Sequence, residues 1–120
     1  MDDIKVTKDK IYSNTHNRAI ASIDIIKIYD SPYHYKGIIL HDAFPTELKN
    51  LIKEYYDLLD DCILSHIDEV EEKIMNYELS LQDNNLKIFR IELMENNKEL
   101  KFFTKYPTAN GFVDDYPFTN

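Results

Sequence analysis

The segment LLDDCILSHIDEVEEKI, residues 58–74, is the densest cluster of side chains in this chain that could support chemistry. It holds the only cysteine, Cys62, together with His66 and six carboxylates. On a helix, a cysteine and a histidine four residues apart project from the same side, which can supply two ligands to zinc. A zinc site needs at least a third protein ligand, and His34 and His41 are the only plausible donors apart from carboxylates. We therefore predict no metal site and expect Cys62 to pack in the core as a small hydrophobic residue.

Other patterns of catalysis and cofactor binding are missing from the sequence. His41 and Asp42 are adjacent, but neighbouring residues of a strand point to opposite faces, so they suit a cap on the turn before Pro45 better than a catalytic dyad. Glycine occurs only at 37 and 111, which excludes the phosphate-binding patterns GxGxxG and GxxxxGK. We predict no cofactor and no catalytic residue. A small hydrolase-type enzyme that uses His34, His41 or His66 is a less favoured alternative.

Carboxylates form the clearest surface pattern of the segment 47–72. Six of them fall within about 80° of one another on a helical wheel: Glu47, Glu54, Asp57, Asp61, Asp68 and Glu72. If the helix is continuous, they form a ridge about 38 Å long, at a rise of 1.5 Å per residue. The ridge is either a solvated face or a contact surface for a basic partner, and both interpretations stay open.

The segment DDYPF, residues 114–118, is a second candidate contact. Asp114, Asp115 and Tyr116 could dock a partner, because aromatic rings supply buried area and acids steer the encounter. In the alternative, Tyr116 and Phe118 fold back onto the domain. The predicted partner-binding residues of the whole chain are Glu54, Asp57, Asp61, Asp68, Glu72, Asp114, Asp115 and Tyr116.

The overall charge narrows the class of partner. The chain carries 22 acidic against 14 basic residues, a net charge of −8. Nucleic acid and anionic membranes should be repelled by such a surface, whereas a basic protein should be attracted. Acidity that serves only solubility is the simpler explanation. The chain is rich in isoleucine, lysine, asparagine and tyrosine and has only two arginines. This composition suggests an AT-rich bacterial or phage genome.

Several features indicate a cytoplasmic protein. A single cysteine cannot form an internal disulfide, which suits a reducing compartment. The longest apolar runs have three residues, far below the roughly 18 that span a membrane. The first ten residues, MDDIKVTKDK, lack an apolar segment behind a basic start, so we expect no secretory signal.

The expected elements are strands, one long helix and strands again. Residues 3–12 predict an edge strand, and 18–30 and 33–44 predict an antiparallel hairpin. Apolar residues then recur at steps of three or four from Leu48 to Tyr77, after Pro45, which favours one helix over 46–77. Two helices joined near Leu64–Ser65 are the alternative. In the helical pattern, Leu59, Ile63, Ile67, Val70 and Ile74 face the core.

Three further runs, 77–82, 86–94 and 98–104, predict a meander with Tyr77, Leu79 and Leu81 and then Leu100 and Phe102 facing inward. We expect a two-layer α+β fold, with an antiparallel sheet of about five strands packed on the long helix, kinked or straight. Residues 1–106 are expected to form one domain, and 107–120 an irregular C-terminal tail packed on its surface. Apolar residues on both faces of 18–30 leave room for a homodimer.

No motif in the chain is specific to a known family. The features together predict a small acidic, non-enzymatic binding protein that neutralises a basic protein partner by occlusion, as an immunity protein does to a bacterial toxin. The alternatives are a phage-encoded antagonist that mimics the charge of nucleic acid, and an accessory or regulatory domain.

Overall fold

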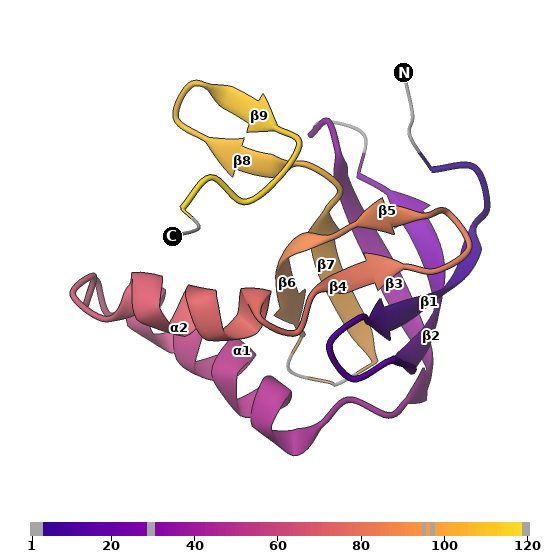
Figure 1. The fold of residues 1–120 in the computed structure, drawn as a ribbon, viewed down its shortest axis with the longest axis horizontal. Coiled ribbons are helices and arrows are strands. Elements are labelled where there is room, and N and C mark those ends of the chain that lie inside the picture. Colours follow the sequence, from indigo (N-terminus) through magenta and orange to yellow (C-terminus); the bar gives the residue numbers. More distant parts are fainter. Residues whose placement is uncertain (1–3, 29–30, 95, 97, 119–120) are drawn as a thin grey trace.

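The computed structural model describes residues 4–28, 31–94, 96 and 98–118, and its largest unit is one antiparallel sheet of seven strands (Figure 1). The predicted strands 3–12 and 18–30 and the tail 107–120 each extend into residues outside these ranges. The sheet contains β1 (Lys8–Ser13), β2 (Arg18–Lys27), β3 (His34–Asp42), β4 (Leu79–Leu81), β5 (Leu86–Lys87), β6 (Phe89–Leu93) and β7 (Glu99–Phe103). Their order is β5-β4-β1-β2-β3-β7-β6. Because β5 and β6 are separated only by Ile88 yet form the two edges, the sheet curls until it nearly closes into a barrel.

The predicted two-layer α+β fold is therefore wrong. The N-terminal hairpin and the C-terminal meander are not separate halves of a sheet that lies on a helix, since β1 pairs with β4 and β3 pairs with β7. Residues 3–12 were expected to hold an edge strand, but β1 lies between β4 and β2. A sheet that curves around its own interior buries its apolar face without a helical layer across it. The antiparallel pairing of β2 with β3 is confirmed.

The core follows the alternation of the strands. Every second residue of β1, β4 and β7 points inward, and the predicted inward positions Leu79, Leu81, Leu100 and Phe102 are confirmed as buried. Gly37 of β3 lies opposite Leu100, and a Cβ at this position would come within 2.9 Å of the Leu100 Cδ1 atom. Among the described residues, the apolar side chains with no exposed surface are Ile11, Ile20, Ile23, Leu48, Leu81, Leu100 and Phe102. Leu48 belongs to a helix, so a helix also contributes to the interior of the barrel.

Two short helices replace the predicted long one. The first, α1, spans Thr46–Asp60 after Pro45, and the second, α2, spans Ile67–Met75. Between them Cys62 has a φ of +57°, the left-handed conformation that ends many helices. The Ile63 N–H donates to the Leu58 carbonyl at 2.9 Å, and the Cys62 N–H donates to the Leu59 carbonyl at 3.2 Å. This is the hydrogen-bond pattern of a Schellman motif, which stops α1 and lets α2 return antiparallel beside it (Figure 1).

The C-terminal segment also has regular structure. In the tail that we expected to be irregular, β8 (Tyr106–Thr108) and β9 (Gly111–Val113) form a separate hairpin. The Phe112 ring on this hairpin packs against Tyr33 and Phe103, with ring centroids 5.1 and 6.0 Å away. Neither α1 nor α2 is long and apolar enough to cross a membrane, and the described residues contain no other candidate span.

One buried carboxylate fastens the turn between β4 and β5 to β1. The Asp9 Oδ1 atom accepts hydrogen bonds from the backbone N–H groups of Lys10 and Asp83, at 2.6 and 2.8 Å. Its Oδ2 atom accepts from the backbone N–H and the side-chain amide of Asn84, at 2.9 and 2.8 Å. Four donors therefore converge on a single side chain where the barrel approaches closure.

The substitution Asp9→Ala should lower the free energy of unfolding by about 2–3 kcal/mol, because it removes the acceptor from several partly buried donors at once. Urea denaturation followed by circular dichroism measures the change. The matched control is Asp83→Ala, which removes an exposed carboxylate from the same turn and should cost less than about 0.5 kcal/mol. Equal losses for the two variants would show that Asp9 does not hold the turn.

Candidate functional site

The structure separates the groups that could have formed a metal or catalytic site. Cys62 is exposed in the connection between the helices, so the expectation that it packs in the core is wrong. Because α1 has already ended, Cys62 and His66 do not share a helical face. The His66 ring lies 3.8 Å from the Glu69 carboxylate, and both side chains are well exposed. Within the described ranges, no three His, Cys, Asp or Glu side chains gather where a metal could bind.

His34 and His41 lie at opposite ends of β3. The His34 ring stacks on Phe103 with centroids 4.0 Å apart, and burial lowers its pKa, with a further lowering by Lys101. His41 is exposed at the other end of the strand. The neighbouring Asp42 accepts the Phe44 N–H at 3.0 Å, so it caps the turn before Pro45 as predicted.

The carboxylate ridge predicted on one long helix does not exist as a continuous line. Glu54 and Asp57 lie on α1, Asp61 follows its last turn, and Asp68 and Glu72 lie on the returning α2. All five side chains are exposed. Asp57 accepts a hydrogen bond from Lys53 at 2.6 Å, one turn earlier, so its charge is partly offset. The reversal at Cys62 folds the row of acids back on itself around the end of the helical hairpin.

That end of the hairpin exposes aliphatic side chains. Leu59, Ile63 and Leu64 are 42%, 46% and 63% exposed, which contradicts the expectation that Leu59 and Ile63 face the core. We call residues 59–66 the hairpin tip; it projects from the helical end of the molecule in Figure 1. Exposed acids lie on both sides of these aliphatic residues in the sequence: Asp60 and Asp61 at the end of α1, and Asp68 and Glu69 in the first turn of α2. The hairpin tip thus combines an apolar centre with an acidic surround.

A buried ion pair connects the helical hairpin to the barrel. The Arg90 Nε atom of β6 donates to the Glu71 Oε2 atom of α2 at 2.9 Å, and the Glu71 side chain is only 9% exposed. The Tyr106 hydroxyl of β8 donates to the same carboxylate at 2.8 Å and accepts from the Arg90 Nη2 atom at 2.9 Å. Burial and the hydrogen bond to Glu71 hold the pKa of Tyr106 well above its usual range, so the hydroxyl stays protonated. We call these three residues the Arg90 network.

The backbone at Arg90 explains how a strand residue reaches the helices. The pairing of β6 with β7 shifts between Phe89 and Glu92, and Arg90 has a φ of +53°. A bulge of this kind redirects side chains at the edge of a sheet. The guanidinium lies 5.0 Å from the centroid of the Tyr106 ring, and the Arg90 carbonyl accepts from the Tyr56 hydroxyl of α1 at 3.0 Å. The network could not be predicted from the sequence, because nothing in the strand pattern marks a bulge at Arg90.

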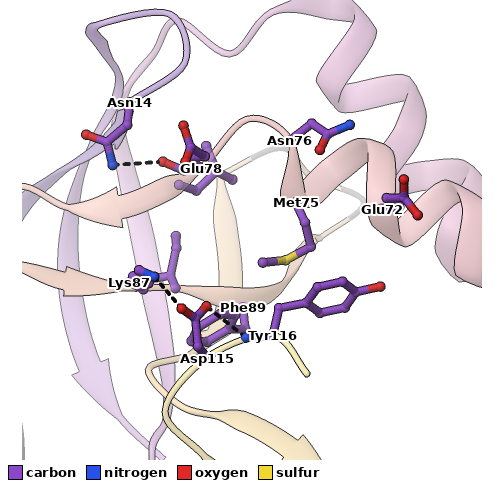
Figure 2. A pocket seen from close by; sticks show the side chains of 11 residues that line it. Asn14, Glu72, Met75, Asn76, Glu78, Lys87, Phe89, Asp115 and Tyr116 are labelled. Atoms are coloured by element: carbon purple, nitrogen blue, oxygen red, sulfur yellow. Dashed lines mark hydrogen bonds and ion pairs between the residues drawn. The ribbon is translucent and has the colours of Figure 1, made fainter. Parts of the chain in front are cut away.

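A cavity of about 620 Å³ lies next to the Arg90 network, between α2, β5 and the C-terminal segment (Figure 2). Of the predicted partner-binding residues, Glu72, Asp115 and Tyr116 line it together, although they come from distant parts of the sequence. Tyr116 is buried against Tyr106 with ring centroids 5.3 Å apart, and burial next to acidic residues raises the pKa of Tyr116 to about 12. The Tyr116 ring thus folds back onto the domain. Asp114 is exposed and pairs with Lys105 outside the cavity.

No protein-family model, curated protein or solved structure matches this chain. The candidate site therefore consists of the hairpin tip and the cavity, defined by their exposure, charge and packing alone.

A double-mutant cycle should show the coupling within the Arg90 network. Removing one partner of a buried ion pair is costly, so Arg90→Met should lower the free energy of unfolding by about 2–4 kcal/mol. In a Glu71→Gln background the same substitution should cost less by about 1–3 kcal/mol, because no buried carboxylate is left unpaired. Urea denaturation of the four proteins gives the coupling energy. Additive losses would show that Arg90 and Glu71 act independently.

Proposed function

We propose that this protein is a non-enzymatic binding protein that neutralises a basic protein partner by occlusion, as an immunity protein or inhibitor does to a bacterial toxin. The observation that carries the proposal is the hairpin tip, where Leu59, Ile63 and Leu64 are exposed among acidic side chains. The domain leaves at least two fifths of the surface of each of these aliphatic side chains uncovered. Their burial in a partner would contribute about 1.5–3 kcal/mol for each side chain that is fully covered.

The acids around the hairpin tip give the class of partner. A negative surround speeds the encounter with a basic protein and disfavours anionic surfaces such as nucleic acid or acidic membranes. Asp61 and Asp68, both expected from the sequence to contact a partner, flank the tip directly, and Glu54 and Asp57 lie further along α1. An apolar centre with a polar rim is also the usual anatomy of a protein interface.

Mimicry of nucleic acid is less well supported than recognition of a protein. The acids lie on two antiparallel helices of 15 and 9 residues, so they do not follow one line as phosphates do along a strand. We further propose a cytoplasmic location, because the exposed thiol of Cys62 suits a reducing compartment. An accessory domain whose acidity serves only solubility is the outcome to accept if no partner is found.

Toxin-like products of the genes next to this one are the partners to test, by biolayer interferometry with catalytically inactivated toxin. In Ile63→Glu and Leu64→Glu, loss of the buried anchor should raise the dissociation rate about 10- to 100-fold each. Asp61→Lys with Asp68→Lys should instead slow association about tenfold at low salt, and the difference should vanish near 0.5 M salt.

The matched control is Val6→Glu, which places a charge on another exposed aliphatic residue away from the helices. This variant should bind like the unmodified protein. A neighbouring product that binds equally well to all the tip variants would contradict the proposed surface. Failure of every basic neighbouring product to bind would contradict the proposed function.

A further inference from the structure

The cavity between α2, β5 and the C-terminal segment has a composition that the hairpin tip does not share. Its apolar lining is formed by Met75, Leu79, Ile88, Phe89 and Tyr116. Its volume of about 620 Å³ falls within the range of pockets that hold small molecules or single side chains. Several apolar groups with a few charged ones at the edge suit an occupant that has both an apolar stem and a polar end.

Acidic residues outnumber basic ones among the charged residues that line the cavity. Glu72, Glu78 and Asp115 are acidic, and Lys87 is the one basic residue among the described lining residues. The Lys87 ammonium pairs with Asp115 at 2.5 Å, and the Glu78 carboxylate accepts a hydrogen bond from Thr15 at 3.1 Å. Glu72 has no ion pair among the residues that the structure describes. An anionic occupant would therefore meet repulsion, and a cation would find at least one carboxylate unengaged.

We propose that this cavity receives a basic side chain of the protein partner, arginine in preference to lysine. The aliphatic stem of the side chain would lie on Met75 and Phe89, while its charged end meets the carboxylates of Glu72 and Asp115. Arginine is preferred because a planar guanidinium can stack on an aromatic ring such as that of Tyr116, whereas an ammonium is more strongly hydrated. The proposal rests on the proposed function, since it names the chemistry that the partner presents at a second contact.

Lys87 is a basic residue of the chain itself that already pairs with a carboxylate of the cavity. Its ammonium already pairs with Asp115 beside the cavity, as Figure 2 shows, so it competes for one of the carboxylates that an incoming cation would use. Removal of Lys87 should therefore strengthen the binding of a cation. A role of the ion pair in folding alone would not produce this gain, so Lys87→Met separates the two explanations.

The test is an NMR titration of the intact protein with the tripeptide acetyl-Gly-Arg-Gly-amide, followed through the Met75 methyl and Tyr116 ring signals. Matched peptides carry lysine, norleucine or glutamate in place of arginine. We expect saturable shifts with the arginine peptide, at a dissociation constant of about 1–10 mM, which is typical of a single isolated side chain. Affinity should be about two- to fivefold lower for the lysine peptide, and the norleucine and glutamate peptides should not saturate.

Variants of the residues that line the cavity show whether the arginine peptide binds there. Glu72→Gln should weaken binding of the arginine peptide about two- to fivefold, and Lys87→Met should strengthen it by a similar factor, as expected for exposed charge pairs. Asp83→Asn is the matched control, because it neutralises an exposed acid in the turn between β4 and β5 that does not line the cavity. It should leave the affinity unchanged.

Three results would overturn the proposal: no saturable shift with the arginine peptide, equal binding of the norleucine or glutamate peptide, or binding that ignores both Glu72→Gln and Lys87→Met. Because the titration uses no protein partner, it can fail while the tip variants still weaken a toxin complex. In that case the proposed function stands and only the cavity contact is lost. Conversely, if the arginine peptide binds but none of the neighbouring gene products binds the protein, the cavity site stands and the proposed function is contradicted.

Discussion

The carboxylate of Glu71 is the constraint on which the arrangement of this molecule outside the barrel depends. A buried carboxylate is tolerated only when cations and hydrogen-bond donors replace the water it has lost. Here Arg90 and Tyr106 meet that need, and the three residues belong to α2, β6 and β8. Satisfying one charge therefore fixes the helical hairpin and the C-terminal segment against the same edge of the sheet. The left-handed backbone of Arg90 is part of this arrangement, because it turns the side chain toward the helices.

Both surfaces that we assign to a partner depend on that attachment. The helix α2 carries Glu71 on its buried side, begins next to the hairpin tip and contributes Glu72 to the cavity. Tyr116 packs on the Tyr106 ring and closes the cavity from the other side. The interior of the barrel is filled mainly by its own strands and by residues of α1, and Ile74 of α2 packs against it. We therefore distinguish the sheet, which forms the base of the molecule, from the Arg90 network, which places the proposed contact surfaces on it.

Local features of the fold could be predicted from the sequence, whereas the way they assemble could not. Alternation identified Leu79 and Phe102 as buried, because a period of two belongs to the strand itself. The pairing of Ile11 with Leu81 joins distant parts of the chain, and no local pattern encodes it. One helix over 46–77 was favoured because Cys62 takes a left-handed conformation usually left to glycine or asparagine, and the alternative of two helices joined near Leu64–Ser65 is the one that the structure confirms. Glu72 was predicted as part of a carboxylate ridge, and Asp115 and Tyr116 as part of the segment 114–118, but only the folded chain shows that the three border one cavity.

Hydrogen–deuterium exchange on Arg90→Met, compared with the unmodified protein, tests this division most directly. Exchange reports local opening separately for each segment of a fold. If the Arg90 network holds the contact surfaces in place, amides of α2 and of β8 should exchange about tenfold or more faster in the variant. Amides of β1, β2 and β3 should lose no more protection than the fall in the free energy of unfolding allows, and they should remain the slowest to exchange. Unchanged exchange in α2 and β8, or exchange of β1, β2 and β3 as fast as that of α2 and β8, would contradict the account.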